Sequence, residues 1–88
     1  MVFYKLHLKK SVRKKDLASV PKKDATRIVK RIKQLAVDPF PEDAVRLRGR
    51  DEWRIRQGNY RILYLVEQAN VTVIVIKVVH RREAYRNL

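Results

Sequence analysis

The chain has 88 residues, and its 22 lysines and arginines outnumber 9 acidic residues to give a formal net charge of +13. This length predicts a single domain, residues 1–88, with a modest core and no room for a second active domain. The absence of cysteine excludes disulfides, thiol catalysis and a zinc ribbon. So large a positive charge indicates a polyanionic partner, with nucleic acid ahead of an acidic protein or a membrane surface; a merely well-solvated surface is the alternative.

The N-terminal half is expected to form a strand followed by two helices. Residues 2–8 alternate polar and apolar side chains, which predicts a strand rather than the apolar segment of a signal peptide. Residues 9–19 predict a short helix, and residues 22–37 carry an apolar stripe at helical spacing that stops at Asp38-Pro39. The two helices should form a hairpin over one face of a sheet. No apolar run approaches the roughly 20 residues needed to cross a bilayer, so we expect a soluble, cytoplasmic protein with no membrane partner.

From residue 44 onward the apolar residues recur with a period of two, which is typical of strands. The predicted strands cover residues 44–48, 53–57, 60–67 and 71–79. The polar tail, residues 80–88, predicts a short helix. Helices that are segregated from a run of hairpin-connected strands indicate an α+β fold. We therefore expect an N-terminal strand, an α-helical hairpin, a mostly antiparallel sheet of about four to five strands and a short C-terminal helix.

A two-residue turn at Gly58-Asn59 would set the register of the two middle strands and place Arg56 opposite Arg61. Side chains alternate between the two faces of a strand. The face toward the helices is then predicted to carry Trp53, Ile55, Tyr60, Ile62, Tyr64 and Val66. The opposite, outer face carries Arg54, Arg56 and Arg61.

A three-residue loop at residues 68–70 is expected to place Glu67 opposite Val71 and, farther along, Arg61 opposite Lys77. The outer face would then be basic at one end, with Arg54, Arg56, Arg61, Lys77 and Arg81. Its other end would be apolar, with Leu63, Leu65, Val71, Val73 and Val75. The residues expected to face the helices are Thr72, Ile74, Ile76 and Val78. Monomers rarely expose a large apolar patch, so the tail or a partner chain should cover the apolar end.

The arginines of the outer face suit phosphate chemistry. Like charges directly opposite on a sheet are destabilising, so Arg56 and Arg61 are expected to hold an anion, unless they extend into solvent or pair with nearby acids. Arginine is a poor base but binds phosphate bidentately. This chemistry fits attack of an RNA 2′-hydroxyl on its neighbouring phosphate, for which the protein aligns the substrate and stabilises negative charge. DNA lacks that hydroxyl and would be inert.

Metal and cofactor chemistry is not expected. The two histidines, His7 and His80, are far apart in sequence and have no carboxylates nearby at ligand spacing. There is no Ser-His-Asp arrangement, and two glycines cannot build a phosphate-binding loop. The reaction is therefore expected to be metal-independent.

An ordered set of motifs in the C-terminal half resembles the RelE/ParE toxin superfamily, and RelE more closely than ParE. The motifs are Arg46-Leu-Arg-Gly49, Trp53-Arg-Ile-Arg56, Gly58-Asn-Tyr-Arg-Ile-Leu-Tyr64 and His80-Arg-Arg-Glu-Ala-Tyr-Arg86. The resemblance implies the RelE-like microbial RNase fold and a toxin of a toxin–antitoxin pair. RelE-like members are endoribonucleases that bind the ribosome in contact with rRNA, cut mRNA in the A site and leave a 2′,3′-cyclic phosphate. A cognate antitoxin wraps around them and inhibits them. ParE-like members poison DNA gyrase and remain the alternative, with an inactive relative as a third possibility.

The resemblance also implies roles for individual residues. Arg61 matches the family's transition-state arginine, and Arg81 matches a second catalytic arginine at the leaving 5′-oxygen. Arg54 and Arg56 stand where the family has a basic pair assigned to RNA binding and proton-transfer support. Tyr85 matches the tyrosine that stacks on the substrate base.

Further RNA contacts are expected from Arg48, Lys77, Arg82 and His80. The basic pair is arginine here where lysines are common, and lysine more readily acquires a pKa suited to a general base. The identity of the base is therefore open. His80 is a candidate, because histidine is the side chain whose ordinary pKa lies near neutrality, although it can equally be a strand-end residue. Arg82 can exchange roles with Arg81.

Overall fold

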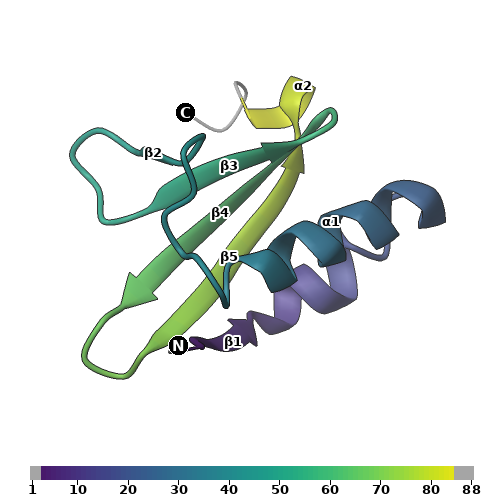
Figure 1. Ribbon diagram of the computed structural model, residues 1–88. Helices are drawn as coiled ribbons and strands as arrows, with labels where there is room; N and C mark the ends of the chain where they lie inside the picture. Colours follow the sequence, from purple (N-terminus) through teal and green to yellow (C-terminus); the bar gives the residue numbers. More distant parts are fainter. Residues whose placement is uncertain (1–2, 85–88) are drawn as a thin grey trace.

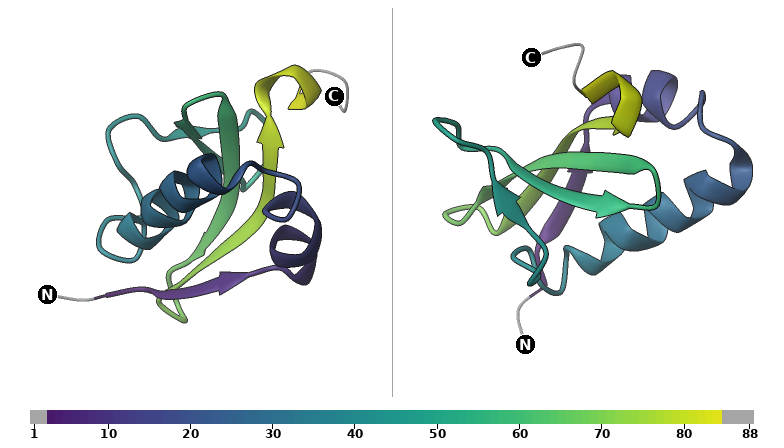
Figure 2. Two further views of the ribbon diagram at one scale, coloured as in Figure 1. Left: turned by 90° about the vertical axis from the view of Figure 1, so that its right-hand side faces the viewer. Right: turned by 90° about the horizontal axis from the view of Figure 1, so that it is seen from above.

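The computed structural model describes residues 3–84 as two layers, a five-stranded sheet with two helices packed on one face (Figure 1; Figure 2). The strands are β1 (Lys5–Leu8), β2 (Val45–Arg46), β3 (Trp53–Gln57), β4 (Tyr60–Glu67) and β5 (Thr72–His80). The helices are the short π-type helix η1 (Val12–Asp16), α1 (Lys22–Gln34) and α2 (Arg81–Ala84). No helix in the described part of the chain is long and apolar enough to cross a membrane.

The sheet has the order β1-β5-β4-β3-β2. β1 runs parallel to β5, and every other neighbouring pair is antiparallel. The chain can return to β5 in the parallel sense because the helices carry it across one face of the sheet. The predicted α+β fold with a mostly antiparallel sheet is therefore confirmed.

The core lies between η1, α1 and the inner face of the sheet. The apolar stripe of α1 is buried, as predicted, through Ile28 and Ile32. The predicted inner face of β3 and β4 is also confirmed. Its fully buried members are Ile55, Ile62 and Tyr64, and the residues packed beside them are Trp53, Tyr60 and Val66.

The two N-terminal helices and the strand β2 span fewer residues than the sequence predicts. After α1 the Asp38 side chain accepts a hydrogen bond from the Phe40 backbone N–H at 3.0 Å, which is a turn that competes with helix. The strand expected at residues 44–48 is reduced to β2. It ends there because the Leu47 N–H bonds to the Glu52 carbonyl and Gly49, with φ of 73°, reverses the chain.

The register of the β3–β4 hairpin is the predicted one, and Arg56 lies opposite Arg61. Gly58 has a φ of 58° while Asn59 has no positive φ. That combination is the type II′ turn, whose first central position favours glycine. The local turn chemistry alone therefore brings the two arginines together.

The predicted register between β4 and β5 is wrong at the loop end. Glu67 pairs with Thr72 rather than with Val71, because Val71 still belongs to the loop and has a left-handed φ of 47°. The shift by one residue exchanges the two faces. Val73 and Val75 therefore lie on the inner face, where they are fully buried, and not on the outer face as expected. Opposite them β1 places two leucines that also pack on the core.

A β-bulge farther along β5 returns the residues that follow it to the faces predicted for them, but it pairs them with residues of β4 other than the predicted ones. Ile76 is skipped in the pairing with β4, so Arg61 lies opposite Val79 rather than opposite Lys77. The extra residue reverses the alternation a second time. Val78 consequently returns to the inner face, as predicted.

The apolar end of the outer face is smaller than predicted. Leu65 pairs with Ile74, which therefore faces outward and not toward the helices, and both are half-buried together with Leu63. The loss of Val73 and Val75 to the core is the reason for the difference. The tail expected to cover this region lies, from residue 85 onward, outside the described residues.

Candidate functional site

A pocket of about 430 Å³ lies at the end of the sheet where the β3–β4 turn meets α2. We call it the arginine pocket, because four arginines line it around the Gly58-Asn59 turn: Arg56, Arg61, Arg81 and Arg82. The described residues that line it include no aspartate or glutamate. A concave surface lined by one sign of charge concentrates ions of the opposite sign.

A backbone hydrogen bond joins the two sequence segments of the arginine pocket. The Arg81 N–H donates to the Asn59 carbonyl at 2.7 Å. This bond holds the start of α2 against the hairpin turn, where Figure 1 shows the two segments side by side. The final pair of the β4–β5 ladder, Tyr60 with His80, places α2 directly after it. Arg61 and Arg81 are therefore brought together by the sheet although they are distant in sequence.

The arginines of the pocket differ in burial. Arg61 is only 8% exposed, whereas Arg56, Arg81 and Arg82 are exposed. Electrostatic interactions are stronger in a partly desolvated setting than in water. Arg61 therefore provides a fixed charge at the base of the pocket, and the other three provide charges that can close on a ligand.

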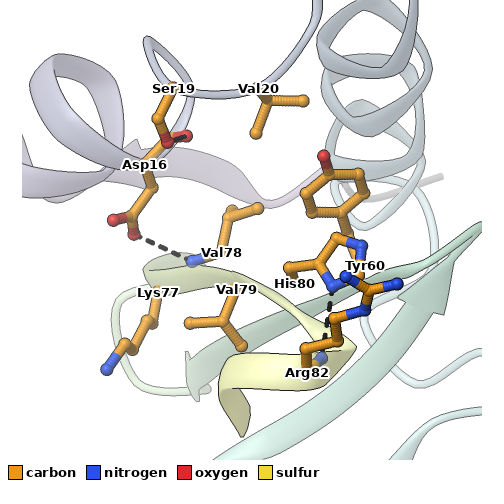
Figure 3. A pocket seen from close by; sticks show the side chains of 9 residues that line it. All are labelled: Asp16, Ser19, Val20, Tyr60, Lys77, Val78, Val79, His80 and Arg82. Atoms are coloured by element: carbon orange, nitrogen blue, oxygen red, sulfur yellow. Dashed lines mark hydrogen bonds between the residues drawn. The ribbon is translucent and has the colours of Figure 1, made fainter.

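A second pocket, of about 480 Å³, adjoins the first on the helix side of the sheet (Figure 3). We call it the edge pocket, because it lies along β5 beyond the end of β1. Its polar lining consists of Asp16, Ser19, Tyr60, Lys77, His80 and Arg82. Tyr60 and Arg82 line both pockets, so the two hollows adjoin one another at the end of the β4–β5 ladder.

Hydrogen bonds fix two side chains of the edge pocket. Asp16 Oδ2 accepts the Val78 backbone N–H at 2.9 Å, and His80 Nδ1 accepts the Arg82 backbone N–H at 3.2 Å (Figure 3). The His80 ring also packs edge-to-face on Tyr60, with 5.2 Å between ring centroids. His80 thus holds the first turn of α2 and keeps Arg82 at the junction of the two pockets.

The structure brings together four of the predicted site residues, the arginines of the arginine pocket. Arg54 is half-buried opposite Leu63 and does not line that pocket. Lys77 and His80 line the edge pocket instead. His80 does so from the inner face, where it pairs with Tyr60, and Lys77 does so from the outer face, where it pairs with Leu63.

Arg48 lies in the exposed loop that precedes β3. The length of β3, roughly 14 Å at the usual rise per residue, separates this loop from the arginine pocket (Figure 1). Tyr85 lies outside the described residues. The structure therefore gives Arg48 no part in the arginine pocket.

The sequence reasoning missed the polar residues Asp16, Ser19 and Tyr60 of the edge pocket. Asp16 and Ser19 belong to residues 9–19, whose sequence pattern predicts a short helix and marks neither side chain as part of a site. Tyr60 was assigned to the core alone, although its position beside the Gly58-Asn59 turn places it at the end of the sheet. Among the side chains that the structure describes, no group of three or more His, Cys, Asp or Glu residues is placed to hold a metal ion.

The shifted pKa values belong to a cluster that supports the fold. Burial raises the pKa of Tyr64 to about 12, and its hydroxyl donates to the Pro39 carbonyl at 2.7 Å. A hydrogen bond from Arg31 lowers the pKa of Asp43 below its ordinary value. These contacts attach α1 and the loop after it to the centre of the sheet, away from both pockets.

Residues 6–85 match the model of the family described as the ParE toxin of the type II toxin–antitoxin system parDE. The chain belongs to the RelE/ParE toxin family. It is 34% identical over 77 residues to the RelE1 protein of Methanocaldococcus jannaschii, an alignment that covers 83% of this chain and 86% of that protein. The family resemblance inferred from the motifs is therefore confirmed.

Solved RelE-type structures share the fold. The toxin–antitoxin complex RelBE2 of Mycobacterium tuberculosis matches with a TM-score of 0.81 at 26% identity, over 91% of this chain and 100% of that chain. The RelE–RelB complex of Pyrococcus horikoshii matches with a TM-score of 0.80 at 29% identity, over 90% and 96% of the two chains. Isolated Escherichia coli RelE, at 23% identity and a TM-score of 0.75 over 97% and 99%, has the same fold.

Proposed function

We propose that this toxin is a metal-independent endoribonuclease that cuts mRNA in the ribosomal A site and so inhibits translation in the cytoplasm. The observation that carries the proposal is the convergence of Arg56, Arg61, Arg81 and Arg82 on one pocket. Arginine binds phosphate oxygens bidentately and stays charged at every physiological pH. Four such groups around one pocket suit a phosphodiester whose charge increases during the reaction.

The proposed reaction uses a nucleophile supplied by the RNA. The 2′-hydroxyl gives its proton to a water molecule and attacks the adjacent phosphorus, the bond to the 5′-oxygen breaks, and that oxygen takes up a proton from water. The products are a 2′,3′-cyclic phosphate and a free 5′-hydroxyl. Arg61, at the base of the pocket, stabilises the phosphorane, and Arg56 opposite it holds a second phosphate oxygen. Arg81, fixed beside the hairpin turn, stabilises the leaving oxygen.

Positioning and charge stabilisation are the contributions of the described arginines to this mechanism. The described lining of the arginine pocket contains no carboxylate or imidazole, and arginine is a poor proton acceptor. Alignment of a nucleophile with its target can contribute about 7–11 kcal/mol to lowering a barrier. The ribosome would supply much of that alignment by holding the codon, which accounts for the proposed dependence on ribosomes. Stacking of a base on Tyr85 remains a prediction.

A cognate antitoxin is the second proposed partner. The related Mycobacterium tuberculosis and Pyrococcus horikoshii proteins are seen in toxin–antitoxin complexes. The half-buried apolar residues Leu63, Leu65 and Ile74 on the outer face adjoin the arginine-bearing end of the sheet. An antitoxin segment with apolar and acidic side chains could cover this surface and neutralise part of the +13 charge.

The test is primer extension on a defined mRNA in a purified translation system. Wild-type protein should give discrete cuts at A-site codons. Arg61→Ala should lower the cleavage rate by about 10²–10³-fold, the usual cost of removing one donor to a developing negative charge. Arg81→Ala tests the same pocket at an exposed side chain, where loss of folding is not a concern. Arg27→Ala, an exposed arginine of α1, is the matched control and should keep full activity.

Wild-type rates in both Arg61→Ala and Arg81→Ala would contradict the assignment of the site. The family description names a ParE toxin, so inhibition of DNA gyrase is the alternative function. Intact mRNA together with persistent growth arrest would support that alternative, and a DNA supercoiling assay would then decide.

A further inference from the structure

We propose that the edge pocket is a second phosphate-binding subsite, which holds the phosphate next to the one bound in the arginine pocket. This inference rests on the proposed function, because it extends the path of the RNA beyond the phosphate that is cut. The substrate strand would pass from the arginine pocket over Tyr60 and Arg82 into the edge pocket. The toxin would then contact at least two consecutive phosphates of a single strand.

The closeness of the two pockets is the first argument. Tyr60 and Arg82 line both of them. An extended strand that leaves the arginine pocket at this end of the sheet meets the edge pocket directly. Arg82 is held at the junction because its backbone N–H is bound by His80 Nδ1. Its exposed side chain can therefore bind either phosphate.

The donors that line the edge pocket are the second argument. Lys77 and Arg82 are cationic, and Ser19 and Tyr60 carry hydroxyl groups. His80 Nδ1 already accepts a hydrogen bond, which leaves the Nε2 N–H as the ring donor. Phosphate oxygens accept hydrogen bonds from all of these groups. The aromatic rings of Tyr60 and His80 also offer surfaces on which a base can stack.

One carboxylate, Asp16, also lines the edge pocket, and its role is structural. β1 ends at Leu8 while β5 continues to His80, so part of the β5 edge has no neighbouring strand. Asp16 Oδ2 accepts the hydrogen bond of the Val78 N–H, which β1 does not reach. The edge pocket forms here because the Asp16 side chain, and not a further strand, lies along this part of the β5 edge. The two cations of the lining exceed the single negative charge of Asp16, and the excess of 22 basic over 9 acidic residues in the chain adds to the attraction of phosphate.

The experiment measures binding of short RNAs that cannot be cut, by NMR titration of ¹⁵N-labelled protein. The probes are a 2′-O-methyl dinucleotide, with one phosphate, and two 2′-O-methyl trinucleotides that extend it by one nucleotide on the 5′ or the 3′ side. For wild-type protein one of the two extensions should tighten binding by roughly threefold to tenfold, the contribution of one ordinary hydrogen bond in water. Backbone signals of Ser19, Val78 and His80 should shift only with that trinucleotide.

Two substitutions separate the edge pocket from the arginine pocket. Lys77→Ala removes an exposed cation, and His80→Asn removes the ring while keeping an acceptor for the Arg82 N–H. Lys77→Ala should reduce the gain from the extension while leaving dinucleotide binding within about twofold, since Lys77 does not line the arginine pocket. His80→Asn should reduce the gain by a larger factor than it weakens dinucleotide binding, since His80 also holds the backbone of Arg82. Lys33→Ala, an exposed lysine of α1, is the matched control and should keep the full gain. Arg61→Ala should weaken the dinucleotide and the trinucleotide by the same factor.

The inference is overturned if neither extension tightens binding to wild-type protein. It is equally overturned if the gain persists in both Lys77→Ala and His80→Asn. Either result together with normal A-site cleavage would leave the proposed nuclease intact. A gain that disappears in both variants, from a protein that cuts no mRNA, would support the subsite and contradict the nuclease.

Discussion

Arg56 and Arg61 lie directly opposite one another across the β3–β4 hairpin, and Arg56→Gln is expected to stabilise the folded protein while impairing its function. Hydrogen-bonded and non-hydrogen-bonded pairs alternate along an antiparallel ladder, and the pair next to the turn, Gln57 with Tyr60, is hydrogen-bonded in a two-residue hairpin. Arg56 and Arg61 therefore form a non-hydrogen-bonded pair, whose side chains lie closest. Glutamine keeps most of the length and polarity of arginine but removes the repulsion.

The magnitude follows from the geometry of the pair. Like charges directly opposite on a sheet cost on the order of 0.2–1 kcal/mol. A gain of about 0.5 kcal/mol raises Tm by about 2–4 °C in a domain of this size. The repulsion is screened by salt, with a Debye length of about 10 Å at 0.1 M and about 3 Å at 1 M. The gain should therefore be largest in dilute buffer and shrink as salt is added.

The assay is thermal unfolding of the wild type, Arg56→Gln and Arg27→Gln, followed by circular dichroism at several concentrations of sodium chloride. Arg27→Gln is the control for the rise in stability that removal of any one positive charge gives a protein with a net charge of +13. Inorganic phosphate should stabilise the wild type more than Arg56→Gln, because a ligand bound by the folded state alone raises its stability. The reasoning is refuted if Arg56→Gln is no more stable than Arg27→Gln in dilute buffer, or if phosphate stabilises both variants equally.

Two further predictions concern Tyr64 and the hairpin turn. Burial raises the pKa of Tyr64 from 10.0 to about 12, so the folded protein keeps a proton that the unfolded chain loses in this range. The protonated hydroxyl of Tyr64 contributes about 2–3 kcal/mol to the free energy of unfolding below pH 10, and this contribution is lost as the pH rises to 12. In urea denaturation, the free energy of unfolding of Tyr64→Phe should therefore fall less steeply than that of the wild type between pH 10 and pH 12. Equal slopes for the two proteins would contradict the raised pKa. Gly58→Ala should cost about 1–2 kcal/mol through its φ of 58° alone, because a Cβ there meets no atom within 4 Å. It should also reduce mRNA cleavage, because the Asn59 carbonyl that holds Arg81 would move, whereas Gly49→Ala has a similar backbone cost and should leave cleavage unchanged.

The parts of the fold that depend on local chemistry were predictable. The Gly58-Asn59 turn fixes its own hairpin, and the alternation of apolar residues then assigns the inner face of β3 and β4. The apolar stripe of α1 likewise needs only the helical period. The motifs around Arg61 and Arg81 were enough to identify the family, although not to show which residues share a pocket.

The connection between β4 and β5 was not predictable in the same way. Its loop includes Val71, a β-branched residue with positive φ, which is an uncommon conformation for such a side chain. No sequence signal marks the bulge at Ile76. Both features satisfy a long-range requirement: Val73 and Val75 must face the core beside β1, while the end of β5 must deliver α2 to the hairpin turn.

By itself, the sequence determined the charge, the sheet-forming segments, the β3–β4 hairpin and the membership of a toxin family, because each depends on composition or on residues near one another in the chain. The alternation of side chains also predicts that Arg56, Arg61 and Arg81 share one end of the outer face. Only the tertiary structure decided that Arg82 joins these three in one pocket while Arg54 does not. It also decided that His80 and Lys77 line a different hollow and that Arg48 lies at the far end of β3. The positions of the residues on β5 and α2 follow from one loop residue, Val71, and one bulge in β5, whereas the loop before β3 sets the position of Arg48. A shift of one residue along a strand moves every later side chain to the other face, and the burial of distant parts of the chain selects among such registers.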